Sequence, residues 1–164
     1  MSRPVGLLMM AGVLALAPAA GFSQGVVSQK NLSLGLAKTI AEAALGACKS
    51  KGFSTSVAVV DRAGQLMVLL RDEGASAQTA EMSRRKAYTA RMFRTSTMEF
   101  QKRTAEPLYA AQRDVTDILA LGGGVPIQIG DDVIGGVGSS GSSQPQDDAC
   151  ARAGVAKVAD LLKP

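Results

Sequence analysis

Two apolar runs flank a tight turn in residues 56–70, SVAVVDRAGQLMVLL. Residues 56–60 predict one strand and residues 65–70 predict the next, because nearly every position in both runs is apolar. Asp61 begins the turn and Gly64 ends it, as in a β-hairpin. Strands with this pattern are covered on both faces or lie in an oligomer, so we expect the hairpin to be largely buried.

Helical patterns lie on both sides of the hairpin. Upstream, Ser33 can cap a helix that runs to about Lys51, where Gly52 favours its end. Downstream, small and apolar residues recur at helical spacing over residues 76–94. Residues 95–109 predict a short helix followed by a loop.

The last third of the chain is rich in glycine and predicts a second hairpin. Its strands are residues 125–129 and 133–137, and residues 119–121 are a candidate for a further short strand. Asp147 and Asp148 open a final helix, where acidic side chains suit the positive end of the helix dipole. Helix, two strands, helix, two or three strands and helix together favour an antiparallel sheet packed against helices, an α+β fold.

The N-terminal segment predicts export. Arg3 is the only charged residue before Lys30, and residues 5–17 are apolar throughout. A positive start, a short apolar run and a small-residue exit are typical of a secretory signal peptide. An uncleaved anchor is the alternative, but the run is shorter than the roughly 20 residues that span a bilayer.

Small residues after the apolar run predict cleavage between Ala19 and Ser23. Residues 1–23 would then be removed, and residues 24–164 would form one domain in the periplasm or outside the cell. An oxidising compartment permits a disulfide between Cys48 and Cys150. Two buried free thiols are the alternative.

Histidine is absent from the whole chain. This excludes a Ser-His-Asp or Cys-His nucleophile pair, a histidine-based zinc site and a haem with a proximal histidine. Acid–base chemistry would have to use carboxylates, lysine or tyrosine.

One face of the predicted helix at residues 76–94 is the best local candidate for a site. Met82 and Phe93 could contact a flat ligand, Lys86 could meet a carboxylate, and the Thr89 hydroxyl could hydrogen-bond or approach a metal. The alternative is that Lys86 reaches water and Thr89 bonds its own helix. Basic residues crowd the same region and favour an anionic ligand or a solvated face, but not nucleic acid, since no aromatic platform accompanies them: Arg84, Arg85, Lys86, Arg91, Arg94, Lys102 and Arg103.

Two further patterns give weaker signals. The glycines at residues 122–124 lack the Gly-Lys-Ser/Thr ending of a phosphate loop, so they predict a turn where backbone approaches a ligand or a strand. Asp114 and Asp117 are three residues apart and could hold a hard cation weakly, or lie solvated on the surface.

Four stretches together resemble the GlcG/HbpS family of haem-binding and haem-degrading proteins. They are SRRKAYTA at 83–90, LGGGVPI at 121–127, VIGGVGSSG at 133–141 and DDACARAG at 147–154. The resemblance covers residues 32–162. It implies a profilin-like fold, with an antiparallel sheet of about five strands flanked by helices, in a homo-oligomer.

The resemblance also implies haem as cofactor, bound at residues 86–90, with the Thr89 hydroxyl near the iron. Tyr88 or Lys86 could replace it as ligand, and Asp114 and Asp117 echo an iron-binding carboxylate pair. Arginines could pair with the haem propionates. The full set of expected haem contacts is Met82, Arg84, Arg85, Lys86, Tyr88, Thr89, Arg91, Phe93, Gly123 and Gly124.

Three functions are consistent with these features. The first is an exported protein that binds haem, or a similar flat anionic molecule, for sensing, storage or degradation. The second is a non-catalytic small-molecule sensor or interaction subunit, with a membrane sensor kinase as partner. The third is an enzyme that acts on a small organic acid or a corrinoid.

Overall fold

The computed structural model describes residues 25–164, so the predicted signal peptide at residues 1–23 lies outside the described residues. Four antiparallel strands form one sheet in the order β2-β1-β4-β3. Their bounds are β1 Ser56–Val60, β2 Leu66–Arg71, β3 Gly124–Ile129 and β4 Asp132–Ser140. The predicted α+β class is therefore confirmed.

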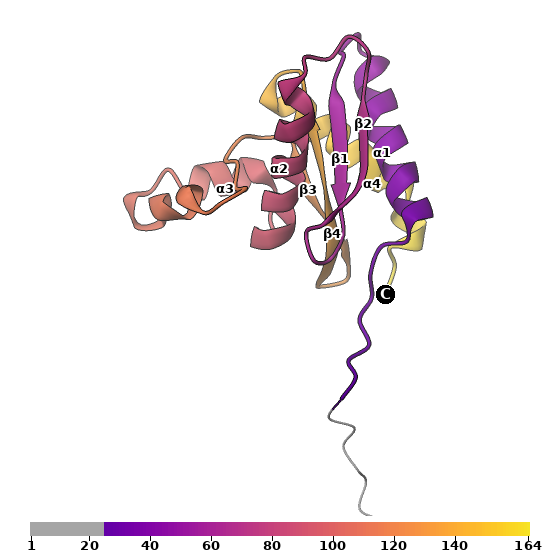
Figure 1. The fold of residues 1–164 in the computed structure, drawn as a ribbon, viewed down its shortest axis with the longest axis vertical. Helices are drawn as coiled ribbons and strands as arrows, with labels where there is room; N and C mark the ends of the chain where they lie inside the picture. The colour runs from indigo at the N-terminus through magenta and orange to yellow at the C-terminus, as the bar shows by residue number, and fades with distance from the viewer. Residues whose placement is uncertain (1–24) are drawn as a thin grey trace, which may run out of the picture.

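Helices cover both faces of the sheet (Figure 1). On one face lie α1 (Leu34–Lys49) and α4 (Gln144–Lys157), which pack against each other and against the central strands. On the other face lies α2 (Gln78–Phe93), in contact with β1, β3 and β4. Two shorter elements, α3 (Thr97–Arg103) and η1 (Pro107–Asp114), project sideways from the body, and η2 (Ala159–Leu161) follows α4.

The hairpin at residues 56–70 is buried unevenly. Every residue of β1 is buried, because β1 lies between β2 and β4 and under helices on both faces. In contrast β2 is an edge strand, and Leu66 and Leu69 are 45% and 41% exposed. The apolar pattern predicts that both faces of the hairpin are covered. This holds completely only for the inner strand, β1.

The expectation of about five strands is wrong within residues 25–164, where the sheet has four. Residues 119–121 form no strand. Side chains of flanking helices bond to the backbone here instead: the Leu119 amide donates to Thr89 Oγ1, and the amide of Gly122, the next residue after the segment, donates to Gln144 Oε1. In addition, β4 continues to Ser140, three residues beyond the end of the strand predicted at residues 133–137.

Glycines let α2 lie directly on the sheet. A Cβ atom at Gly138 would sit 2.1 Å from the Ser83 carbonyl oxygen, and one at Gly136 would sit 2.3 Å from that of Ala87. Contacts this short exclude any side chain on these strand positions. The close approach brings the inward side chains of α2 to the end of β4.

A disulfide joins Cys48 in α1 to Cys150 in α4, with Cα atoms 5.5 Å apart. Both residues are buried. The bond ties together two helices that pack on the same face but lie 102 residues apart in the chain. No helix within residues 25–164 is long and apolar enough to span a membrane.

Candidate functional site

A buried ion pair lies where β4 ends and α4 begins. Lys86 Nζ donates to Asp147 Oδ2 and to the Ser139 carbonyl oxygen, each at 2.9 Å. Both charged side chains are only 2% exposed. Buried charges require partners of this kind, so the pair fixes α2 against α4 across the end of the sheet.

Local structure places each partner. Asp147 lies in the first turn of α4, where its other oxygen, Oδ1, accepts from the Ser142 amide at 3.1 Å and from the Ser142 hydroxyl at 2.7 Å. Burial lowers the pKa of the Lys86 amine, and the Asp147 carboxylate acts in the opposite direction. The sequence places Asp147 at a helix start but gives no sign that Lys86 is its partner.

Gly123 makes room for this ion pair. Its φ is +121°, and an added Cβ would sit 2.6 Å from the Ser139 carbonyl oxygen, 2.7 Å from Asp147 Cβ and 3.0 Å from Lys86 Nζ. The glycine run therefore does what the sequence predicts in general terms, allowing a close backbone approach. The groups that approach are the Ser139 carbonyl of β4 and the side chains of the Lys86–Asp147 pair.

Replacing Gly123 with alanine is expected to destabilise the protein by about 2 kcal/mol or more, through strain at positive φ and overpacking. Urea unfolding measures the change. Gly46→Ala is the matched control, because Gly46 is exposed in α1 and an added Cβ meets nothing within 4 Å. That control should gain roughly 0.5–1 kcal/mol. Equal effects of the two substitutions would contradict the close approach.

A surface hollow of about 340 Å³ opens beside the ion pair. Met82 and Leu121 form its apolar wall, and Lys86 and Asp147 lie at its base. We call it the Lys86 hollow. Its remaining lining is polar or small: Ser76, Gln78, Thr79, Ser140, Gly141, Ser142 and Gln144.

Thr89, the predicted iron contact, lies deep beneath the surface. It is 0% exposed, its hydroxyl donates to the Arg85 carbonyl oxygen at 2.8 Å, and it accepts from the Leu119 amide at 2.9 Å. Thr89 is not among the residues that line the Lys86 hollow. A contact with iron would require the Leu119 segment to move, and that role stays a prediction.

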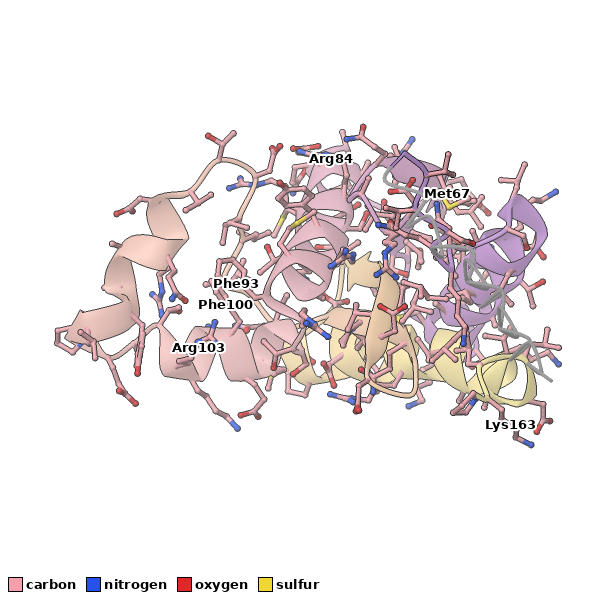
Figure 2. The ribbon with its side chains drawn as sticks, turned by 90° about the horizontal axis from the view of Figure 1, so that it is seen from below. Met67, Arg84, Phe93, Phe100, Arg103 and Lys163 are labelled. Atoms are coloured by element: carbon pink, nitrogen blue, oxygen red, sulfur yellow. A yellow bond between two sulfur atoms is a disulfide. The ribbon has the colours of Figure 1, made fainter. Side chains whose placement is uncertain are left out.

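Other predicted haem contacts lie on different sides of α2. Tyr88 lies beside Gly64 in the β1–β2 turn, where an added Cβ would meet its ring at 2.8 Å. Phe93 packs on Phe100 with ring centroids 4.3 Å apart (Figure 2). Gly124 faces the α2 backbone, since an added Cβ would sit 2.3 Å from the Lys86 carbonyl oxygen. Only Met82 and Lys86 of the predicted helix face share the hollow.

The basic residues of this region have separate partners. Arg84 bridges Glu81 and Asp117, each at 2.7 Å. Arg85 donates to the Ile118 carbonyl oxygen at 2.6 Å, and Arg103 lies over the Phe93 and Phe100 rings. These arginines stabilise loops and rings of the protein itself.

The predicted carboxylate pair is divided between two environments. Asp117 accepts from Arg84, whereas Asp114 is exposed at the end of η1. Within residues 25–164 no three His, Cys, Asp or Glu side chains gather in a way that could hold a metal ion. A cation at Asp114 and Asp117 stays a prediction.

Comparison with known proteins gives consistent matches. The family model described as "Haem degrading protein HbpS-like" matches residues 32–156. An uncharacterised 15.0 kDa protein from the dhaT-dhaS intergenic region of Citrobacter freundii is 31% identical over 119 residues, which are 71% of this chain and 84% of the relative.

Solved structures also resemble this fold. HbpS from Streptomyces reticuli, solved as a double mutant, is 36% identical with a TM-score of 0.79, covering 87% of this chain and 97% of its own. A PduOC:heme complex is 27% identical with a TM-score of 0.71, covering 77% of this chain and 94% of its own.

Proposed function

The chain belongs to the HbpS-like family of haem-degrading proteins, and from this premise we propose that it binds haem, or a similar flat anionic molecule, in the Lys86 hollow. One observation carries the location: Met82 and Lys86, both on the predicted ligand-binding helix face, line the same hollow beside the glycine-rich end of β4. The relative solved with haem supports the choice of ligand.

The side chains of the hollow are compatible with such a guest. Met82 and Leu121 offer apolar contact to a flat ring, and the Met82 thioether is a group that ligates haem iron in some proteins. Lys86 lies at the base, where Asp147 already neutralises its charge. Polar side chains of the lining such as Gln78 and Gln144 are therefore left to meet a carboxylate. Haem would supply the iron chemistry, while this chain would supply the apolar wall and the polar lining.

The residues of the Lys86 hollow are better suited to binding haem than to breaking it down. Breakdown needs a group that can move protons, and the described hollow holds Lys86 and Asp147 bound to each other. Their mutual contact favours a structural role. We therefore infer haem sensing or storage as the activity, which also accommodates a signalling partner.

We propose in addition that the domain works outside the cytoplasm and as a homo-oligomer. The Cys48–Cys150 disulfide supports an oxidising compartment, as does the apolar start of the sequence. The partly exposed Leu66 and Leu69 on edge strand β2 support contact with another copy.

Titration of haemin into the mature chain is expected to give a shifted, saturable Soret band. Met82→Ala should weaken binding at least about tenfold, equivalent to about 1.4 kcal/mol, because it removes the wall and the thioether together. Absorbance titration measures both results.

Met92→Ala is the matched control, since Met92 lies on the same helix but beside Gly64, away from the hollow. It should bind haemin as the parent does. Absence of a Soret shift would refute haem binding. If Thr89→Val or Tyr88→Phe lost haemin affinity while Met82→Ala kept it, the ligand would be assigned to another side of α2.

A further inference from the structure

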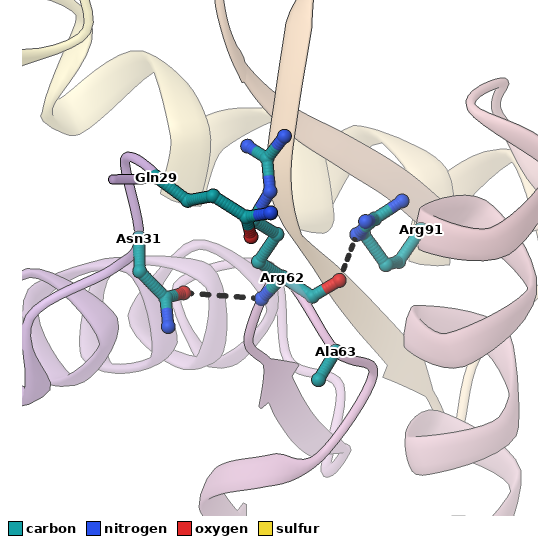
Figure 3. Close-up of a pocket in the computed structure, with 5 residues that line it drawn as sticks. All are labelled: Gln29, Asn31, Arg62, Ala63 and Arg91. Atoms are coloured by element: carbon teal, nitrogen blue, oxygen red, sulfur yellow. Dashed lines mark hydrogen bonds between the residues drawn. The ribbon is translucent and has the colours of Figure 1, made fainter. Parts of the chain in front are cut away.

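A second hollow, of about 360 Å³, lies at the opposite end of the sheet from the Lys86 hollow. Figure 3 shows the residues that line it. Its lining comes from three places: Gln29 and Asn31 before α1, Arg62 and Ala63 in the β1–β2 turn, and Arg91 in the last turn of α2. The Lys86 hollow lies near Ser140, which pairs with the start of β1, whereas this hollow follows the end of β1. We call it the arginine hollow.

Both guanidinium groups are held in place by the protein. Arg91 Nε donates to the Arg62 carbonyl oxygen at 2.6 Å, and Asn31 Oδ1 accepts from the Arg62 amide at 3.1 Å. Figure 3 shows these two bonds on either side of the Arg62 backbone. The Arg62 side chain is further fixed by Asp132 at 2.8 Å. Two cations are thus oriented before any ligand arrives.

Arg91 keeps unused hydrogen-bond donors within the described part of the chain. Within residues 25–164 its two terminal nitrogens have no hydrogen-bond partner, and no carboxylate forms an ion pair with it. The acidic groups nearby are engaged elsewhere: Asp132 pairs with Arg62, and Asp61 Oδ1 accepts from the Ala63 and Gln65 amides.

The electrostatic surroundings of Arg91 are positive despite these acids. Burial lowers the pKa of Arg91, and the positive charges of Arg62 and Arg94 lower it further, while Asp132 and Asp61 act in the opposite direction. An anion placed here would relieve the repulsion among the arginines.

We propose that the arginine hollow is a binding site for a small oxyanion, a carboxylate or phosphate group that takes a forked contact from the free edge of Arg91 beside Arg62. A planar guanidinium with two free terminal nitrogens matches either group in a bidentate manner. The amides of Gln29 and Asn31 supply neutral donors at the rim. This site is independent of the haem proposal, since the two hollows share no residue.

The test is calorimetric titration of the mature, haem-free chain with inorganic phosphate and, separately, with succinate, at constant ionic strength set by chloride. Saturable binding of either is expected, and Arg91→Gln should weaken it at least tenfold. Arg84→Gln removes the same charge from the same helix, but Arg84 is already paired with Glu81 and Asp117, so this control should bind as the parent does.

The two probes identify the source of the oxyanion. Preference for phosphate indicates a phosphorylated ligand, and preference for succinate indicates a carboxylic acid. Displacement of succinate by haemin would identify a porphyrin propionate as the natural carboxylate. No saturable binding of either probe, or equal weakening by Arg91→Gln and Arg84→Gln, would overturn the proposal. Haemin binding in the Lys86 hollow is measured by a Soret shift that Met82→Ala weakens and Arg91→Gln does not, so either idea can fail alone.

Discussion

Replacing Cys48 and Cys150 together with alanine is expected to lower the free energy of unfolding by about 4 kcal/mol. The bond closes a loop with a sequence separation of 102 residues, and loops of this length restrict the unfolded chain strongly. Proteins of this size have total stabilities of about 5–15 kcal/mol, so the loss is a large part of the whole. Urea unfolding of the parent and the double variant measures it.

Two controls separate the cross-link from the packing of the sulfur atoms. The parent protein, reduced in denaturant and refolded under reductant, loses the bond but keeps both side chains, and should lose nearly as much stability as the double variant. Thiol counting in unfolded, unreduced protein should find no free thiol. Two free thiols, or a double variant within about 1 kcal/mol of the parent, would contradict a stabilising disulfide.

The sequence predicts the fold well where periodicity and turn residues agree. The inner strand of the first hairpin has the predicted bounds, Ser56–Val60, and Ser33 caps α1 by accepting from the Leu36 amide. The expected fifth strand is wrong because residues 119–121 look like a strand by composition alone. The amides of Leu119 and of the adjoining Gly122 bond to the side chains of Thr89 and Gln144, which lie 22 residues or more away in sequence.

The site is less accessible to sequence reasoning, because its main contact joins residues 61 positions apart. Lys86 and Asp147 are each recognisable in the sequence, one on a helix face between the apolar Met82 and Phe93 and one at a helix start. Nothing in the spacing pairs them. The glycines at 136 and 138 are the signal that could have helped, since they indicate that a helix lies close against β4.

The arginine hollow shows the same limit. Arg62 is predicted as part of a turn and Arg91 as part of a basic helix, and both predictions describe single elements. Their juxtaposition depends on how the β1–β2 turn meets the last turn of α2. Local patterns cannot supply that geometry.

Replacing Lys86 with methionine is expected to destabilise the protein by about 3–5 kcal/mol, although the side chain volume is nearly conserved. The cause is Asp147, whose carboxylate is 2% exposed and would lose its only charged partner within residues 25–164. Donors from Ser142 remain, but hydrogen bonds from neutral groups compensate a buried charge only in part. Urea unfolding, with circular dichroism as the probe, gives the value.

The double variant Lys86→Met with Asp147→Leu decides whether the cost comes from the unpaired charge. Removing both charges should restore most of the lost stability, because a buried ion pair is often no more stabilising than apolar side chains in its place. Lys102→Met is the surface control, since the Lys102–Glu99 pair is more than half exposed and should be worth less than about 1 kcal/mol. If the double variant were as unstable as Lys86→Met, the Lys86 ammonium would stabilise the protein through its hydrogen bond to the Ser139 carbonyl oxygen, and not through its ion pair with Asp147. Restored stability would instead show that the residue that the sequence marks as a ligand contact holds α2 to α4, so that any guest of the Lys86 hollow meets a charge already neutralised by Asp147.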